Sequence, residues 1–233
     1  MSYIILNGVK NTRIQGLMIQ ALPSITKPQI RTQIETIDGR DGDIVTKLGY
    51  SAYDKQLKIG LFGEYNINEI IEYFNSEGTV TFSNEDDKYY KYQIIEAINF
   101  ERLIRFRQAT VTLHVQPFKY SLAEGDTEYL LKNNTEIQIN NSGNIFSKPS
   151  ITLYGSNTCE IYLNGSQVFS IDLGVNDNIT IDTEALEAYS GTTLKNRIVT
   201  GNYDKFYLPV GLNNIKFTGS VTRCYIKNYS RWI

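Results

Sequence analysis

Apolar and polar residues alternate along most of the first half of the chain, which is the pattern of half-buried β-strands. In residues 54–62, one face carries Leu57, Ile59 and Leu61. The run 103–115 repeats the pattern, and its apolar face consists of Ala109, Val111, Leu113 and Val115. Further strands are expected at 29–37, 79–83 and 89–100. The pattern predicts a β-barrel or sandwich-like domain.

One segment of this half has the helical period instead. Asn66 can cap a helix N-terminus, and Glu69 stands in the reciprocal position of a capping box. The apolar stripe of this helix consists of Ile67, Ile70, Ile71 and Phe74. The run 75–78 ends it with a glycine. We therefore expect one α-helix in the first domain.

The second half has the pattern of short strands separated by turn residues. Strands are expected at 150–154, 159–163, 166–173 and 179–182. Asn164-Gly165, between two of them, is a strong hairpin signal. A second hairpin is expected where 214–218 pairs with 221–227 across Gly219-Ser220, and 183–189 is compatible with a helical turn. Strands at this spacing predict a β-sandwich of roughly 100 residues.

Residues 121–128 are small and polar, as in a linker or an exposed crossover. The length of 233 residues is comfortable for two small β-domains. We therefore expect a mainly β protein, with an N-terminal domain at 1–124 and a C-terminal sandwich at 125–233.

Composition and charge narrow the class of protein. The formal net charge is −2, and the basic residues are dispersed, so stable nucleic-acid binding is disfavoured. No apolar run approaches the ~20 residues of a spanning helix, which argues against membrane insertion. The chain starts without the basic and apolar regions of a secretion signal, so we expect it to fold in the cytoplasm. Tyrosine is frequent, with 17 copies, and suits both strands and protein–protein contacts.

The side chains that carry chemistry form no recognisable catalytic or cofactor motif. His114 is the only histidine, it falls on the polar face of its strand, and no nucleophile motif accompanies it. Cys159 and Cys224 fall on inward strand faces, where reduced thiols are favoured over a disulfide. We therefore expect no cofactor, no metal and no enzymatic activity.

Two acidic groups leave alternatives open. Asp38, Asp41 and Asp43 could offer oxygen ligands to a hard cation, but their spacing differs from the calcium-loop pattern and favours a tight turn. A glycoside hydrolase would draw its paired carboxylates from distant strands, and such acids are present in the second half. These are Asp172, Asp182 and Glu184. Solvated acids near strand ends are the simpler interpretation.

A series of motifs runs through the first half in a characteristic order. They are Asn7-Gly8-Val9, Gly16-Leu17-Met18-Ile19, Lys27-Pro28, Ile37-Asp38-Gly39-Arg40-Asp41-Gly42, Leu48-Gly49-Tyr50 and Gln116-Pro117-Phe118-Lys119-Tyr120. This order resembles the N-terminal domain of siphophage distal tail proteins, including the signature loop Asp38, Gly39, Arg40, Asp41 and Gly42.

The second half resembles the galectin-like domain of the same family. The matching segments are Asn141-Ser142-Gly143-Asn144, Lys148-Pro149-Ser150-Ile151, Gly155, Asn164-Gly165, Ile179-Thr180-Ile181-Asp182-Thr183, Pro209-Val210-Gly211-Leu212-Asn213 and Tyr229-Ser230-Arg231-Trp232. The resemblance therefore covers nearly the whole chain.

The resemblance implies a hexameric ring at the distal end of a non-contractile phage tail, located in the virion. It also implies partners: further copies of the chain, the tail tube protein, the tape-measure protein, the tail-associated hub or lysin and, in many phages, a receptor-binding protein. DNA would pass through the lumen of the ring without stable binding. The chain has no room for a host-binding insertion, so a connector is expected.

Competing interpretations are a carbohydrate-binding module, a cell-wall glycoside hydrolase and another tail component such as a tube subunit. The C-terminal half has no histidine, and its only tryptophan is Trp232, so the sugar-binding set of galectins is not present. A ring needs two different surfaces that meet. Candidates for this interface are Tyr89, Tyr90, Tyr92, Arg105 and Arg107, expected on the two long strands 89–100 and 103–115. An ordinary exposed strand pair is the alternative.

Overall fold

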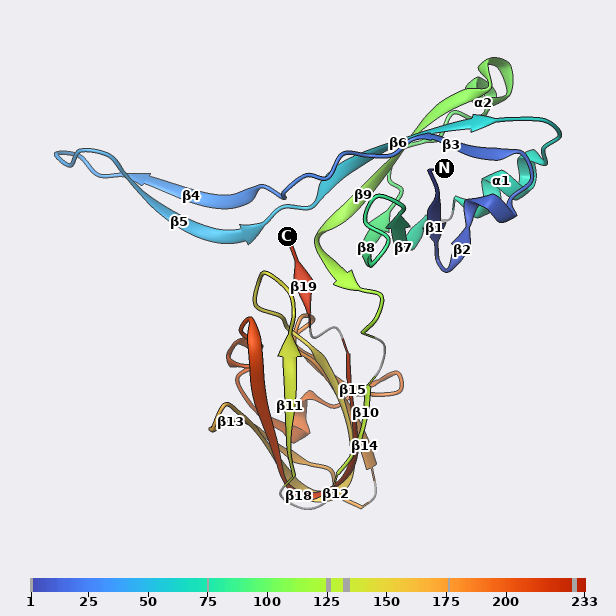
Figure 1. Cartoon of the computed structure of the whole chain (residues 1–233). Helices are drawn as coiled ribbons and strands as arrows, with labels where there is room; N and C mark the ends of the chain where they lie inside the picture. Colours follow the sequence, from blue (N-terminus) through green and yellow to red (C-terminus); the bar gives the residue numbers. More distant parts are fainter. Residues whose placement is uncertain (1, 75, 125–126, 132–134, 176, 228–229) are drawn as a thin grey trace. The chain divides into compact units, whose positions relative to one another are not determined.

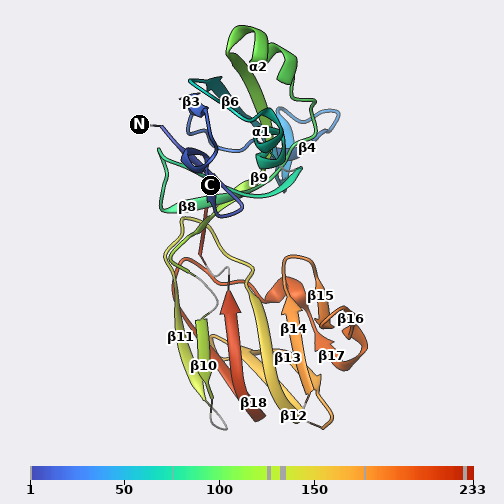
Figure 2. The same ribbon diagram turned by 90° about the vertical axis from the view of Figure 1, so that its right-hand side faces the viewer.

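The structure is a computed structural model, and it describes residues 2–74, 76–124, 127–131, 135–175, 177–227 and 230–233. The chain forms two compact units, Met1–Lys119 with Ile233, and Tyr120–Trp232. The boundary between the units falls after Lys119, whereas the sequence predicted it after residue 124. Residues 125–126, which follow the predicted boundary, lie outside the described part of the chain. Strands dominate both units, as the alternation predicts (Figures 1 and 2).

The first unit is built on a sheet with the strand order β2-β1-β7-β8-β9-β6-β3. The strands are β1 (Ile4–Leu6), β2 (Val9–Lys10), β3 (Leu17–Ala21), β6 (Tyr53–Leu61), β7 (Glu77–Phe82), β8 (Lys88–Gln93) and β9 (Gln108–Ser121), and a 3-10 turn (Asn11–Arg13) follows β2. In β6, Leu57 and Ile59 are fully buried, and so are Val111, Leu113 and Val115 in β9. The period-two alternation therefore predicted the inward face of these two strands correctly.

The predicted helix is confirmed as α1 (Ile67–Tyr73). The Asn66 side chain caps it by accepting hydrogen bonds from the backbone N–H groups of Asn68 and Glu69. Ile70 and Phe74 are buried in the core, but Ile71 is exposed, so the apolar stripe is narrower than the sequence suggested. The helix ends at Tyr73, and Asn75, part of the expected stop signal, lies outside the described residues.

A second helix, α2 (Phe100–Phe106), replaces the start of the strand expected at 103–115. The Asn99 side chain caps it by accepting from the Arg102 N–H at 2.8 Å, and Leu103 is its buried residue. Arg107 ends the helix in the left-handed conformation, with φ of 56°. The prediction of a strand was therefore wrong for the residues before Gln108. A side-chain cap and one buried leucine are enough to form this short helix, and the alternating pattern of a strand begins only after it.

The second unit is a β-sandwich built around two long strands, β12 (Ser150–Leu163) and β18 (Gly211–Lys227). The remaining strands of the sandwich are β10 (Thr127–Leu130), β11 (Glu136–Asn141), β13 (Ser166–Asp172), β14 (Asp177–Asp182), β15 (Glu187–Ser190), β16 (Thr193–Leu194) and β17 (Val199–Gly201), with 3-10 turns at Asn196–Ile198 and Tyr203–Lys205. The short strand β19 (Arg231–Trp232) pairs with β9 and is not part of the sandwich. β12 and β18 pair with each other along most of their length. One half of β12 also pairs with β14 and the other with β13, while β18 pairs with β10 and β11 in the same way. Each long strand therefore serves both layers.

The two long strands bend together where their register shifts, near Gly155 and between Ser156 and Cys159. Opposite this point, Gly219 has φ of +81°, and a Cβ there would lie 2.3 Å from the Thr158 carbonyl oxygen. The sequence placed a hairpin at Gly219-Ser220 and a break in 155–158, and both predictions were wrong. A glycine that permits a bulge in a continuous strand has the same local signature as a glycine in a turn.

The remaining predictions for the second half had mixed outcomes. The Asn164-Gly165 hairpin between β12 and β13 is confirmed, with positive φ at both residues. Cys159 and Cys224 are free and fully buried, and desolvation raises the pKa of the Cys224 thiol to about 12. The segment 183–189 holds a turn and the start of β15 and no helix, and β9 and β10 occupy the two ends of the segment 121–128.

Candidate functional site

A two-stranded arm extends away from the sheet of the first unit (Figure 1). It consists of β4 (Ile30–Thr36) and β5 (Asp43–Tyr50), which pair with each other in a sheet of their own. The signature loop, Asp38 to Gly42, forms the turn at the free end, where Gly39 and Gly42 adopt positive φ. The motif taken from the family resemblance therefore lies at the exposed tip of this arm.

The arm carries apolar side chains that its own unit leaves uncovered. Ile34, Ile37, Val45 and Leu48 are 60%, 46%, 56% and 54% exposed. An isolated two-stranded hairpin is marginally stable in water, and clustered exposed apolar side chains indicate a surface that binds a partner. This arm is therefore the strongest candidate for an assembly surface in the first unit.

The distal half of the arm is acidic. Residues 35–43 contain Glu35, Asp38, Asp41 and Asp43 against a single Arg40. The Thr36 hydroxyl donates to the Asp43 carboxylate at 3.1 Å, which ties the two strands near the charged end. Within β4, the Gln33 amide donates to the Glu35 carboxylate at 2.7 Å. Among the described residues, no group of three or more His, Cys, Asp or Glu side chains is arranged to hold a metal ion, and these acids are no exception.

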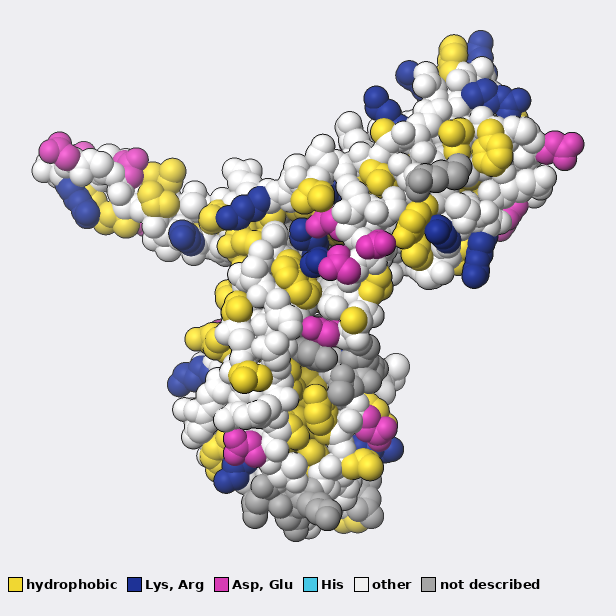
Figure 3. Space-filling view, viewed as in Figure 1, with side chains coloured by type: hydrophobic (Ala, Val, Ile, Leu, Met, Phe, Trp, Pro, Cys, Tyr) yellow, Lys and Arg dark blue, Asp and Glu magenta, His cyan; other side chains and the backbone are white. Residues whose placement is uncertain are grey.

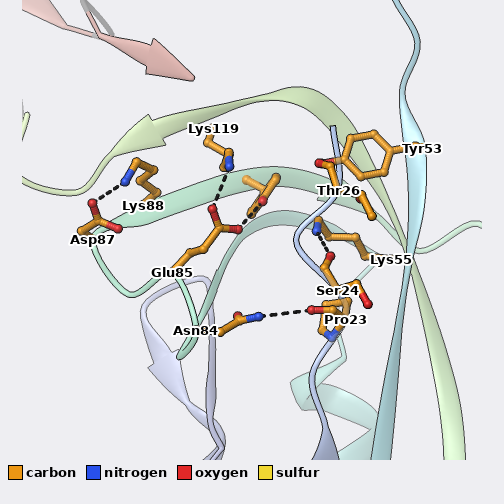
Figure 4. A network of polar contacts seen from close by, with 11 residues as sticks. Pro23, Ser24, Thr26, Tyr53, Lys55, Asn84, Glu85, Asp87, Lys88 and Lys119 are labelled. Carbon is orange, nitrogen blue, oxygen red and sulfur yellow. Dashed lines mark hydrogen bonds and ion pairs between the residues drawn. The ribbon is translucent and has the colours of Figure 1, made fainter. Parts of the chain in front are cut away.

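The root of the arm is held by three side chains that donate to backbone carbonyl groups of the segment 23–26 (Figure 4). The Asn84 amide donates to the Pro23 oxygen at 3.2 Å, and Lys55 Nζ donates to the Ser24 oxygen at 2.9 Å. The Tyr53 hydroxyl donates to the Thr26 oxygen at 3.3 Å. This irregular segment leads into β4, so satisfying its carbonyl groups fixes where the arm leaves the sheet.

Lys55 occupies a core position, with only 3% of its surface exposed. Its Nζ lies 4.9 Å from the centroid of the Tyr90 ring and 5.7 Å from that of Phe82, distances typical of cation–π contacts. Desolvation lowers the pKa of the Lys55 ammonium to about 8, and the Glu85 carboxylate opposes that fall. The rings and the Ser24 oxygen partly replace the water that the ammonium group loses.

Glu85 joins the two sides of this network. Its carboxylate accepts from Lys119 Nζ at 2.7 Å (Figure 4). It also accepts from the Tyr90 hydroxyl at 2.6 Å. Burial raises the pKa of the Glu85 carboxyl, but these hydrogen bonds outweigh it and hold that pKa below its usual value. Burial and the bond to Glu85 raise the pKa of the Tyr90 hydroxyl. Glu85 is thus a buried anion between two buried cations, Lys55 and Lys119.

Two of the motifs from the first half meet at the arm root. Tyr50, at the end of β5, packs edge-on against Phe118, with ring centroids 5.6 Å apart. Lys119, next in the chain, pairs with Glu85 at 2.7 Å. The motifs 48–50 and 116–120 are far apart in sequence, and both contribute to anchoring the arm.

The structure separates the five residues proposed as a ring interface. Tyr90 and Tyr92 are 0% and 2% exposed, so neither offers a surface to a neighbour. Arg105 lies in α2 rather than on a strand, and Arg107 ends that helix with its guanidinium 4.9 Å from the centroid of the Tyr65 ring. The expected pair of strands presenting all five was wrong; an interface role for Tyr89, Arg105 and Arg107 stays a prediction.

Sequence reasoning missed the buried network at the arm root. A signal for Lys55 was present, because it alternates in phase with Leu57, Ile59 and Leu61, all on the inward face. Glu85 gave no comparable signal, because it lies in the polar turn 84–88 and its partners come from β8 and β9.

The acidic and histidine candidates have ordinary structural partners. His114 Nδ1 lies 2.7 Å from the Asp54 carboxylate on a partly exposed strand surface. The Asp182 carboxylate accepts from the N–H groups of Glu184 and Ala185 and so stabilises a turn. Glu184 accepts from the Tyr120 hydroxyl at 3.0 Å. These contacts support the interpretation of turn and strand-end acids.

Comparisons with known proteins give a fold match without a sequence match. No protein-family profile matches the sequence, and no curated protein matches it either. The Dit protein (gp 19.1) of phage SPP1, described as a paradigm of the hub adsorption apparatus in phages infecting Gram-positive bacteria, has a TM-score of 0.64 and 16% identity, over 97% of this chain and 98% of that chain. A chain of the phage P2 baseplate, in its activated conformation with Ca, has a TM-score of 0.53 and 12% identity, over 97% of each chain.

These similarities show that the chain shares the fold of those proteins along nearly its full length. No helix in the described residues is long and apolar enough to cross a membrane.

Proposed function

We propose that this chain is a structural subunit of a phage tail tip, which forms a hexameric ring and connects the tail tube to the hub that attaches to the host. The observation that carries the proposal is the exposed arm, whose apolar side chains need a partner. The full-length fold similarity to the SPP1 Dit protein and the P2 baseplate supports the same conclusion.

The shape of the arm supports a ring. A ring requires a heterologous interface, in which one surface of each subunit meets a different surface of the next. A hairpin that projects from one end of its unit suits such an interface, because it reaches a neighbouring copy. The network of Lys55, Glu85 and Lys119 sets the direction of the arm before assembly, which reduces the entropy lost on binding.

The proposed location is the virion, with further tail proteins as partners: tail tube, tape measure, hub and, in some phages, a receptor-binding protein. The net charge of −2 suits a ring whose lumen lets DNA pass without holding it. The proposed role is non-enzymatic.

The solution mass of the purified chain, with negative-stain images, tests the proposal. A closed ring of six copies of 26.6 kDa has a mass of about 160 kDa. A chain that stays monomeric alone and with its tail partners, or a sevenfold or helical assembly, would contradict the hexamer.

A variant with a shortened arm tests whether the arm is needed for assembly. Replacing residues 32–47 with a short Gly-Ser turn removes exposed residues of the arm and none of the buried core of its unit. We expect this variant to stay monomeric and to keep the melting temperature of the wild-type monomer within a few degrees. A variant that still forms the ring would show that the arm does not carry the assembly.

A carbohydrate-binding module remains the second candidate, because aromatic side chains lie on one face of the second unit. Tyr154 lines a hollow of about 460 Å³. Its ring packs edge-on against that of Tyr225, with the ring centroids 6.0 Å apart. Arg223 already covers the Tyr154 ring at 4.1 Å, which weakens this candidate. Specific glycan binding on an array, lost in Tyr225→Ala, would support it over the ring.

A further inference from the structure

Most side chains of the helix α2 are exposed and are not covered by the rest of the first unit. Ile104 and Phe106 are 42% and 64% exposed, and the Arg105 side chain is 68% exposed. Only Leu103 of this helix is buried. Apolar and basic side chains thus stand next to one another on a short, well-capped helix.

A hollow of about 250 Å³ adjoins α2. Its lining consists of Gln20, Lys58, Arg102, Gln108, Ala109 and Thr110. Two of these residues are cations and two are amides, and none of the described lining residues is acidic. The hollow therefore offers hydrogen-bond donors that favour a carboxylate.

The charge of this surface is opposite to that of the arm tip. Residues 100–107 contain three arginines and one glutamate, whereas residues 35–43 contain four acids and one arginine. Figure 3 shows dark blue and yellow side chains over the region of α2, and magenta side chains at the free end of the arm. Both surfaces also expose apolar side chains, Ile37 on the arm and Phe106 on α2.

The two surfaces lie at opposite ends of the first unit (Figure 1). The arm of a chain therefore does not reach α2 of the same chain, and contact between the two surfaces needs a second copy. Because one end of each unit then meets the other end of the next, the contact is head-to-tail.

We propose that the α2 surface binds the acidic tip of the arm of a neighbouring copy. The carboxylates of Asp38 and Asp41 lie against Arg102, Arg105 and Lys58, and Ile37 packs on Ile104 and Phe106. The inference rests on the proposed function, because it names the surface that receives the arm in the ring.

A nucleic-acid backbone is the other anion that a basic surface can bind. The exposed Ile104 and Phe106 favour the arm, since phosphate groups leave them uncovered while Ile37 covers them. The Glu101 carboxylate, 3.5 Å from the Arg105 guanidinium, also repels a nucleic-acid backbone. It repels the arm tip less, because Arg40 lies among the acids of that loop.

Charge reversal with rescue tests the pairing. We expect Arg102→Glu with Arg105→Glu, and separately Asp38→Lys with Asp41→Lys, each to raise the concentration needed for assembly by more than about tenfold, because like charges then face each other. Combining all four substitutions should bring that concentration back to within about threefold of wild type. Arg13→Glu with Arg197→Glu changes the charge equally at exposed sites elsewhere and should have no such effect.

Disulfide trapping gives a second readout that does not require a closed ring. An Asp41→Cys copy mixed with a Phe106→Cys copy should form an intermolecular disulfide under mild oxidation, since Cys159 and Cys224 are buried and do not compete. The control mixture uses Asp41→Cys with Leu194→Cys, an exposed position in the second unit.

The outcomes separate this inference from the proposed function. A ring that forms normally despite charge reversal, or without rescue or cross-link, overturns the α2 site and leaves the ring standing. A specific cross-link without a closed ring, both for the chain alone and with its tail partners, supports the α2 site and contradicts the hexamer. Absence of both overturns both. Binding of duplex DNA that is lost in Arg102→Glu with Arg105→Glu, with assembly unchanged, also overturns the inference and assigns the surface to nucleic acid.

Discussion

Glu85, Lys55 and Lys119 illustrate how charged side chains are tolerated inside a β-sheet domain. Moving an ion out of water costs several kcal/mol, and the cost is offset only where each charge finds partners. Glu85 has Lys119 and the Tyr90 hydroxyl, while Lys55 has the Ser24 carbonyl group and two aromatic rings. An apolar cluster could fill the same space, but it would leave the Ser24 carbonyl group without the donor that Lys55 supplies.

Glu85→Gln should lower the free energy of unfolding by about 3 kcal/mol at neutral pH, because it leaves Lys119 buried without its anion. The folded-state pKa of Glu85 lies below its ordinary value of 4.5. Its contribution is therefore present above the unfolded-state pKa and is lost as the pH falls through the folded-state pKa. Urea unfolding at neutral and acidic pH should show a difference from wild type that shrinks toward acid.

The matched control is Glu96→Gln, an exposed acid in the same unit, which should change stability by less than about 0.5 kcal/mol. An equal effect of the two substitutions, or a Glu85→Gln effect independent of pH, would show that the network does not stabilise the fold through its charge.

The shared bend of β12 and β18 determines how the second unit closes. Two strands of ordinary length would form a single sheet, whereas two long strands that bend together place their halves in two layers around one core. Gly219 allows the bend because it adopts positive φ at a position where any side chain would clash with the Thr158 carbonyl oxygen. This is a property of the strand pair and not of either strand alone.

Gly219→Ala should therefore destabilise the second unit by about 3 kcal/mol, since it adds a clash with the Thr158 oxygen to the backbone strain. Gly191→Ala is the control: Gly191 also has positive φ, but a Cβ there meets nothing within 4 Å. It should cost about 1 kcal/mol. Thermal unfolding of both variants measures the difference, and equal losses would argue against a steric role for the bend.

The whole molecule consists of two units with separate hydrophobic cores. One core is formed by buried residues between Leu131 and Ile226, and the other by residues between Ile4 and Val115. The arm belongs to neither core. The cores therefore stabilise each unit without the arm, which is the part that the proposed function assigns to assembly.

A fragment of residues 120–233 should fold by itself and unfold cooperatively, because it contains its complete core. Circular dichroism should give a β-rich spectrum and a melting transition that matches one of two transitions in the full chain. A fragment without a cooperative transition would show that the second unit depends on the first.

Period-two alternation determined much of this protein from the sequence alone. It identified the mainly β class and the inward faces of β6 and β9, while the Asn66 cap located α1 and Asn164-Gly165 located a hairpin. These features depend on interactions within a few residues or on burial of one strand face, and such interactions leave a local pattern.

Tertiary structure decided the rest, because it depended on contacts between distant residues. Glycine at 219 is compatible with a turn or a bulge, and only its pairing with Thr158 and Cys159 makes it a bulge. Likewise, residues 30–50 have the pattern of an ordinary hairpin. No local feature predicts that, among the described strands, these two pair only with each other. The same holds for Glu85, whose role exists only because Lys119 and Tyr90 approach it from other strands.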